Sequence, residues 1–181
     1  MTDFGAFIDE VETLRRRAAS DADLVPKISR RLASLNRSAR WLPAEARGSV
    51  DDGYAQHVLY VSKDGGLSIA ALVWKAGQMT PIHNHVAWCV VGVYEGTERE
   101  TRYRLEPGDG SPYLIQTEMR DNCAGGAGGT LADGCDIHSV ANAGGSLAIS
   151  IHVYGADLHR LGSSINRRFD HLPIRQAALS G

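Results

Sequence analysis

The chain of 181 residues lacks long apolar runs and has no excess of charge of one sign. A membrane-spanning helix needs about 20 consecutive apolar residues, and no segment approaches that length. The 19 Lys and Arg residues nearly balance the 21 Asp and Glu residues, giving a formal net charge of -2. This balance offers no electrostatic reason for binding nucleic acid or an anionic membrane. We therefore expect a small molecule as the partner.

Cysteine is also scarce. The three cysteines, Cys89, Cys123 and Cys135, are odd in number and widely spaced, which argues against a disulfide framework and fits a reducing compartment. The first residues, "MTDFGAFIDEVETLRRR", carry acids early and lack the apolar segment of a signal peptide. These features predict a cytoplasmic protein.

The apolar content of 43% is enough for one sizeable core, so we expect a single domain over 1–181, with a helical segment in 1–42 and a barrel in 50–170. Apolar residues recur at helical spacing over 3–19 and 23–36. After Pro43 come short runs rich in β-branched and aromatic residues, such as "LSIAALVW" and "LAISIHVYG", separated by Gly, Asp and Asn. This succession predicts a β-sandwich or jelly-roll barrel.

The glycine-rich segment "CAGGAGGTLADG", at 123–134, lacks the Lys and Ser/Thr of a phosphate-binding loop. We expect it to be a flexible connector.

The stretch "PIHNHVAWC" places His83 and His85 two residues apart. In a strand the two imidazoles face the same way, and leaving them unpaired inside a barrel would be costly. Alone, this pair fits a metal site or two hydrogen-bonded structural histidines equally well.

The wider spacing favours the metal site. Gly77, His83, His85 and Gly96 have the separations of the first cupin motif, with Cys89 where that motif has glutamate. The segment "GCDIHSVAN" resembles the second motif, with three residues between His138 and Asn142 and with Ala132 in place of its usual proline. The resemblance implies an all-β cupin jelly-roll barrel with short N-terminal helices, and a metal held by His83, His85 and His138.

A ligand set of three neutral imidazoles leaves the charge of a divalent ion to be neutralised by other ligands, and leaves about three coordination positions open. An anionic substrate together with dioxygen would fit such a site. Zinc, nickel and copper also accept imidazole ligands, so the spacing alone does not select Fe(II).

A third pattern lies in "LAISIHVYG", where Ser150, His152 and Tyr154 alternate with apolar residues. In a strand all three face one side. They form either a relay, in which Ser150 orients His152 and His152 orients the Tyr154 hydroxyl, or the solvent-facing side of an ordinary strand. Beside a metal site we expect the relay.

Together, the three-histidine pattern, "ETRY" after the first motif and the Ser-His-Tyr strand resemble the cysteine dioxygenase family of thiol dioxygenases over roughly 50–170. The resemblance implies a non-haem Fe(II) enzyme that adds both atoms of dioxygen to a small thiol and releases a sulfinate. It assigns catalysis to Tyr154, positioned by His152 and Ser150.

The resemblance also bears on the substrate. Gln56 stands where cysteine-specific members have an arginine, which resembles the 3-mercaptopropionate dioxygenase branch. In that branch an arginine near the C-terminus binds the carboxylate, for which Arg168 and Arg167 are the candidates, with Arg160 behind them. We expect 3-mercaptopropionate first, mercaptosuccinate next and cysteine third.

Two alternatives remain. Cys89 matches the cysteine that forms a thioether with the tyrosine in eukaryotic members, so a Cys89–Tyr154 crosslink and a plain buried thiol are both open. The chain could also be a metal cupin without redox chemistry, an isomerase, lyase or binding module, although the missing motif glutamate and the Ser-His-Tyr strand count against it. The oligomeric state is not predicted.

Overall fold

The computed structural model describes residues 3–38 and 40–175. Two helices, α1 (Asp3–Arg17) and α2 (Asp21–Arg37), and a short 3-10 helix, η1 (Ala44–Arg47), precede the strands. The strands are β1 (Ala55–Val61), β2 (Ser68–Trp74), β3 (His83–His85), β4 (Cys89–Glu95), β5 (Thr97–Glu106), β6 (Tyr113–Cys123), β7 (Ala127–Thr130), β8 (His138–Asn142), β9 (Ala148–Tyr154), β10 (Ile165–Arg168) and β11 (Ile174–Arg175), with helix α3 (Leu158–Leu161) between β9 and β10.

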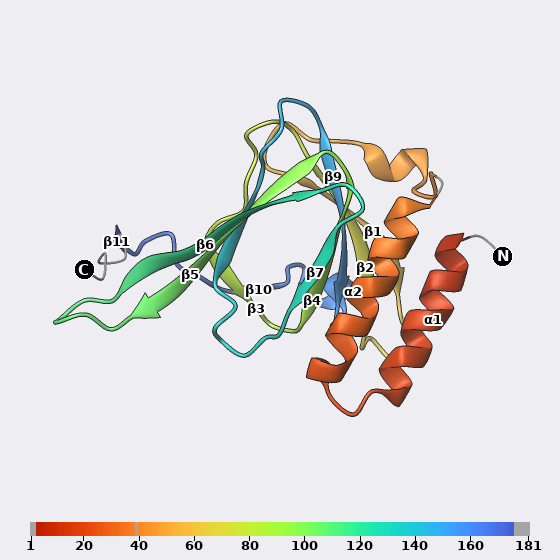
Figure 1. The fold of residues 1–181 in the computed structure, drawn as a ribbon, viewed down its shortest axis with the longest axis horizontal. Coiled ribbons are helices and arrows are strands. Elements are labelled where there is room, and N and C mark those ends of the chain that lie inside the picture. The colour runs from red at the N-terminus through yellow and green to blue at the C-terminus, as the bar shows by residue number, and fades with distance from the viewer. Residues whose placement is uncertain (1–2, 39, 176–181) are drawn as a thin grey trace.

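These strands form two sheets that face one another (Figure 1). One sheet has the order β1-β2-β9-β4-β7, and the other has the order β10-β3-β8-β5-β6-β11. The sheets curl into a barrel, from which the β5–β6 hairpin extends away from the helices (Figure 1). The expected all-β jelly-roll barrel with short N-terminal helices is confirmed.

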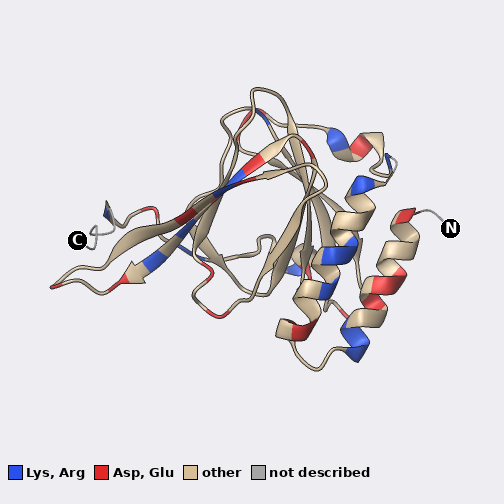
Figure 2. Cartoon of the chain, in the orientation of Figure 1, with Lys and Arg blue, Asp and Glu red and all other residues tan. Residues whose placement is uncertain are grey.

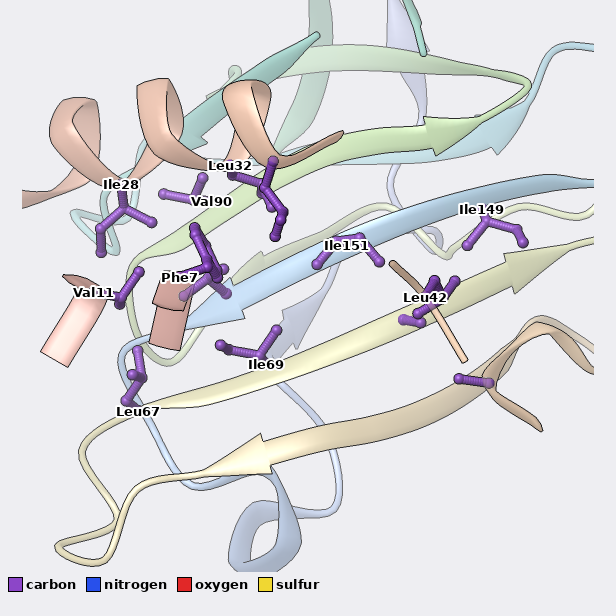
Figure 3. Close-up of a cluster of buried hydrophobic side chains, with 14 of the residues drawn as sticks. Phe7, Val11, Ile28, Leu32, Leu42, Leu67, Ile69, Val90, Ile149 and Ile151 are labelled. Carbon is purple, nitrogen blue, oxygen red and sulfur yellow. The ribbon is translucent and has the colours of Figure 1, made fainter. Parts of the chain in front are cut away.

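Both helices lie on the outer face of the β1-β2-β9-β4-β7 sheet (Figure 1). Phe7 and Val11 of α1 and Ile28 and Leu32 of α2 belong to one buried cluster with apolar residues of that sheet, including Ile151 (Figure 3). The helices present these residues at spacings of about four, which puts them on one face. Covering this outer face leaves β2 and β9 buried on both sides, which explains why all their residues are buried.

The second helix begins two residues earlier than expected because Ser20 caps it. The Ser20 hydroxyl accepts a hydrogen bond from the Asp23 amide at 3.3 Å, which pairs one of the donors left free at a helix start. Lys, Arg, Asp and Glu are distributed over the helices and along the β5–β6 hairpin (Figure 2). Within the described residues, no helix is both long and apolar enough to cross a membrane.

The expectation of a flexible connector at 123–134 is wrong for its middle part. Residues 127–130 form β7, which pairs antiparallel with β4. Gly129 has a packing reason, because a Cβ there would lie 2.4 Å from Cγ1 of Val25 in α2. A glycine at this position therefore lets the helix approach this edge of the sheet closely.

Candidate metal centre

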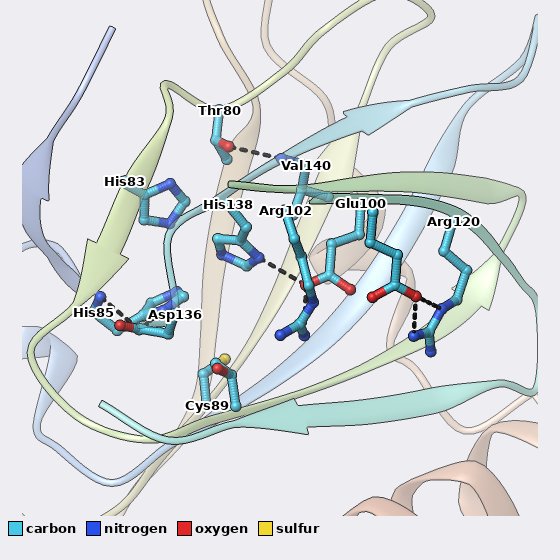
Figure 4. A network of polar contacts seen from close by, with 12 residues as sticks. Thr80, His83, His85, Cys89, Glu100, Arg102, Arg120, Asp136, His138 and Val140 are labelled. Atoms are coloured by element: carbon cyan, nitrogen blue, oxygen red, sulfur yellow. Dashed lines mark hydrogen bonds and ion pairs between the residues drawn. The ribbon is translucent and has the colours of Figure 1, made fainter. Parts of the chain in front are cut away.

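Three histidines meet at one end of the barrel interior. Strand β3 carries His83 and His85, and it pairs antiparallel with β8 so that His83 lies directly opposite His138. The three side chains are buried, and one ligand atom from each lies within 4.8 Å of the others. Figure 4 shows the three rings turned toward a common space, with Cys89 on the far side of it. The structure thus brings together the whole predicted ligand set.

Hydrogen bonds fix the orientation of the two β3 imidazoles. The Nδ1 atom of His83 lies 2.9 Å from the Pro81 carbonyl oxygen, which can only accept, so this nitrogen carries the proton. The Nδ1 atom of His85 lies 3.0 Å from Oδ2 of Asp136, which also accepts from the His85 amide. These partners leave Nε2 of both rings as the free base.

The third imidazole is held by a charged chain. Nδ1 of His138 lies 2.9 Å from Oε1 of Glu100, and the same oxygen pairs with Arg102 at 2.9 Å (Figure 4). Burial by itself would raise the pKa of Glu100, but its contacts with His138 and Arg102 lower it overall. A carboxylate behind a metal-binding imidazole orients the ring and increases its basicity.

The donor atoms fit a first-row metal ion. Burial, followed by the neighbouring histidines, lowers the pKa of His83 to about 3, and burial also lowers the pKa of His85. Both rings are therefore neutral at neutral pH. Nε2 of His138 is buried and has no hydrogen-bond partner among the described residues. A buried polar atom without a partner is costly, and a metal ion would satisfy it.

Ser150, His152 and Tyr154 form a hydrogen-bonded chain inside the barrel. The Ser150 hydroxyl lies 2.8 Å from Nε2 of His152, and the Tyr154 hydroxyl lies 3.0 Å from Nδ1 of the same ring. Burial lowers the pKa of His152 to about 3 and raises that of Tyr154. The Tyr154 ring centroid is 6.5 Å from that of His85, so the chain ends beside the three histidines.

Cys89 occupies the place of the motif glutamate. It lies directly opposite Tyr154 in the β4–β9 pair, and its sulfur is 3.9 Å from Nδ1 of His152. Burial raises the pKa of its thiol, so the group is neutral. Gly96, the last glycine of the first motif, has a φ of +79° at the turn into β5. A residue with a side chain would be strained there.

A cavity of about 340 Å³ lies between the two sheets and reaches His138. Its charged lining residues are Glu98, Glu100, Arg102, Glu118 and Arg120. They alternate along β5 and β6 with side chains that point the other way, as neighbours in a strand must. Cys89 and Val140 add to its wall near the metal centre.

The sequence-based substrate candidates lie elsewhere. Gln56 pairs with Leu72, which faces the barrel interior, but β1 is an edge strand and Gln56 is exposed. Arg168 is opposite His83 in the β10–β3 pair, yet its exposed guanidinium bonds to Asp170 at 3.1 Å. Arg167 stacks over the Phe169 ring. None of the three is among the described residues that line the cavity.

Sequence reasoning gave no role to four polar residues of this interior, which are Asp136, Glu100, Glu98 and Arg102, although Glu100 and Arg102 lie in the "ETRY" segment of the family resemblance. Asp136 lies two residues before His138, in a loop without periodicity. The others form a period-two pattern of charge in "TERETRYRLE", which reads as a solvated strand face. The pattern carried a signal, because the strand follows directly on the first histidine motif.

A three-histidine metal centre in a cupin-type barrel defines the class of protein. The family model described as cysteine dioxygenase type I matches residues 3–168, and the chain belongs to that family. The expected membership is thus confirmed at the level of the family, which is one of thiol dioxygenases.

Solved structures of similar fold include Bacillus subtilis oxalate decarboxylase, at 18% identity over 62% of this chain and 28% of that one, with a TM-score of 0.46. Oxalate oxidase in complex with the substrate analogue glycolate matches at 20% identity over 61% of this chain and 56% of that one, with a TM-score of 0.47. An RmlC-like cupin protein from Desulfovibrio desulfuricans matches at 16% identity over 66% of this chain and 98% of that one, with a TM-score of 0.46. This chain thus spans about a quarter to a half of the length of the two oxalate enzymes. Likeness at this level says nothing about the reaction.

Proposed function

We propose that the protein is a non-haem Fe(II) dioxygenase that converts a small thiol carboxylate and dioxygen into the sulfinate. The observation that carries this proposal is the meeting of three imidazoles with the Ser150-His152-Tyr154 chain in one buried interior. When bound, Fe(II) supplies the redox chemistry that joins dioxygen to the substrate sulfur.

The residues of the chain have separate tasks in this reaction. His83, His85 and His138 would hold the metal through Nε2, while the Pro81 carbonyl oxygen, Asp136 and Glu100 keep the rings oriented. Because no carboxylate is among these ligands, an anionic substrate would be needed to balance the charge of a divalent ion. A thiol binds to a metal as the thiolate, which matches that charge.

Tyr154 acts as the hydrogen-bond donor at the reacting end of the substrate. His152 holds the phenol by its Nδ1, and Ser150 holds His152 by its Nε2, so that the hydroxyl is placed before the substrate arrives. A donor that is already oriented in a water-poor site stabilises developing charge without the cost of reorganisation.

For the substrate we propose 3-mercaptopropionate, ahead of mercaptosuccinate and cysteine. The cavity of about 340 Å³ has room for a thiol of this size. Two of the acids that line it already have partners, because Glu100 contacts His138 and Glu118 contacts Arg120. Only Glu98 remains to pair with a substrate ammonium group. A thiol without an amino group fits that lining better than cysteine does.

The partner of the substrate carboxylate is an arginine, and Arg102 has the better position. It lines the cavity, and its buried Nε has no hydrogen-bond partner among the described residues. Arg168, Arg167 and Gln56 stay predictions from the sequence, because their exposed side chains would have to turn inward. A guanidinium with a free N–H close to the metal centre can receive a carboxylate oxygen directly.

The test is oxygen consumption by protein loaded anaerobically with Fe(II), against 3-mercaptopropionate, mercaptosuccinate, cysteine and cysteamine, with mass detection of the products. We expect uptake that depends on the thiol, and a product that carries two additional oxygen atoms. Stoichiometric iron with no uptake for any of these thiols would overturn the proposal and favour a metal cupin without redox chemistry.

A further inference from the structure

A buried carboxyl group stands behind the Ser-His-Tyr chain. Glu98 lies on β5 with 1% of its surface exposed, opposite Asn122 on β6 and Asn142 on β8, and it lines the cavity. Its Oε1 atom has no hydrogen-bond partner among the described residues. An acid that is fully buried without an ion pair is costly, so its presence here calls for a reason.

Glu98 interacts with two members of the network around the chain. Its carboxyl group hydrogen-bonds to Ser150 and to Trp74. The Trp74 indole has a single N–H, which it shares between Glu98 and the Ser150 hydroxyl, whose oxygen lies 3.2 Å from the nitrogen. Glu98, Ser150, His152 and Tyr154 therefore form one continuous sequence of hydrogen bonds.

This sequence of bonds can run in two directions. If Glu98 is protonated, it donates to Ser150, Ser150 donates to Nε2 of His152, and Nδ1–H donates to the Tyr154 oxygen. The Tyr154 O–H is then not used in the bond to His152 and can donate to another acceptor. If Glu98 is ionised, it accepts from Ser150, so that Nε2 of His152 carries the proton and Nδ1 accepts from Tyr154.

The two states differ by one proton. The imidazole stays neutral in both and exchanges its proton between Nδ1 and Nε2, while Ser150 and Tyr154 keep theirs. Trp74 can only donate, and the Ser150 oxygen accepts that bond in either state. Only the proton of Glu98 is gained or lost.

We infer that Glu98 is a positioning residue whose protonation sets the direction of this hydrogen-bond chain, and that the Tyr154 hydroxyl donates toward the substrate only when Glu98 is protonated. The inference rests on the proposed function, because it concerns the use of Tyr154 in that reaction. Burial raises the pKa of Glu98 to about 7, so the two states exchange near neutral pH.

Other charged and titratable groups face the same interior and must be weighed. They are Glu100 and Arg102 on the same strand, Glu118 and Arg120 on β6, His138 on β8, Cys89 on β4 and His152 on β9. Glu100 raises the pKa of Glu98 further, whereas its bonds to Ser150 and Trp74 lower it. Glu118 is paired with Arg120 at 2.6 Å, which makes it a suitable control.

The experiment compares Glu98→Gln and Glu118→Gln with the unchanged protein, all loaded with Fe(II). The side-chain amide introduced by Glu98→Gln would donate to Ser150 as a protonated acid does, but it cannot ionise. At saturating thiol, kcat of the unchanged protein and of Glu118→Gln should fall by about tenfold per pH unit above the pKa of Glu98. The Glu98→Gln variant should keep its rate across the same range.

Infrared difference spectra between acidic and alkaline samples give a second readout, which does not need turnover. The carboxylic acid C=O band of buried Glu98 should be present in the unchanged protein and absent in Glu98→Gln. If Glu98→Gln fails to fold, Ser150→Ala serves instead. This variant should keep the infrared band, and its kcat should no longer fall as the pH rises above the pKa of Glu98.

The outcomes distinguish a failure of the role inferred for Glu98 from a failure of the proposed function. If kcat still falls with rising pH in Glu98→Gln or in Ser150→Ala, the inference is overturned and the proposed function stands. A complete lack of turnover in the unchanged protein, with the infrared band present, counts against the proposed function instead. Absence of the band from the unchanged protein overturns the role of Glu98 directly.

Discussion

Cys89 and Tyr154 lie directly opposite one another on β4 and β9, both facing the barrel interior. Opposite residues of neighbouring strands have Cβ atoms about 5 Å apart, which is within reach of a covalent bond between their side chains. The geometry thus permits the thioether that the sequence suggested. The bond would form with loss of the thiol hydrogen and one ring hydrogen, with dioxygen as the oxidant.

We expect the crosslink to form when the iron-loaded protein is incubated with thiol and air. The intact mass should fall by about two hydrogens, and a peptide carrying Cys89 should be found linked to one carrying Tyr154. Cys89→Ala should show no change in mass, whereas Cys123→Ala, which removes an exposed thiol, should behave like the unchanged protein. An unaltered mass after many turnovers would leave Cys89 as a packing residue.

Removing a ligand should remove the metal. We expect His138→Ala to lose bound iron, because two remaining imidazoles no longer enclose the ion, and His159→Ala on α3 to retain it. Glu100→Gln should keep the fold and weaken iron binding about 10- to 100-fold, since its carboxylate orients His138. Iron content after dialysis measures all three. Stoichiometric iron in His138→Ala would show that the metal lies elsewhere.

Tyr154→Phe tests the hydrogen-bond donor. The variant should bind iron normally, because the Tyr154 hydroxyl bonds to His152 and not to one of the three metal-binding histidines. It should lose about a hundredfold in kcat, because it lacks the hydroxyl that donates to the substrate. Tyr103→Phe, on β5 and outside the chain of hydrogen bonds, is the matched control. Equal kinetics for the two variants would remove Tyr154 from the mechanism.

The histidine motif and the Ser-His-Tyr strand could be read from the sequence because each lies within one strand, where alternation decides which side chains share a face. The barrel was predictable because short runs of β-branched and aromatic residues are separated by Gly, Asp and Asn. The partners of those residues could not be read in this way, since Glu100 and Asp136 reach the histidines from other segments. The arginine proposed for the substrate carboxylate is the clearest case, because the family resemblance pointed to Arg168 or Arg167 while sheet register places Arg102 in the cavity.

The two arginines can be separated by kinetics. We expect Arg102→Gln to raise KM for 3-mercaptopropionate about tenfold or more, while KM for cysteamine, which has no carboxylate, stays nearly the same. Arg168→Gln should leave both values close to those of the unchanged protein, because its guanidinium is exposed and paired with Asp170. If KM for 3-mercaptopropionate rises in Arg168→Gln and not in Arg102→Gln, then Arg168 is the residue that binds the substrate carboxylate.

The buried carboxyl of Glu98 should also make folding stability depend on pH. Its pKa is raised from 4.5 to about 7 in the folded protein, so between these values the folded state holds a proton that the unfolded state has lost. Stability contributed by this group is therefore complete below about pH 4.5 and falls as pH rises to about 7, by about 3 kcal/mol in all.

Chemical denaturation of the unchanged protein and of Glu98→Gln across this range measures the effect. The free energies of unfolding should diverge with rising pH, with Glu98→Gln gaining relative stability up to about pH 7 and none beyond it. Glu118→Gln removes a partly exposed carboxylate from the same cavity and should run parallel to the unchanged protein. Parallel curves for Glu98→Gln as well would mean that Glu98 ionises as readily in the fold as in the free chain. Its carboxyl could then not remain protonated near neutral pH, and it could not hold the Tyr154 hydroxyl free to donate.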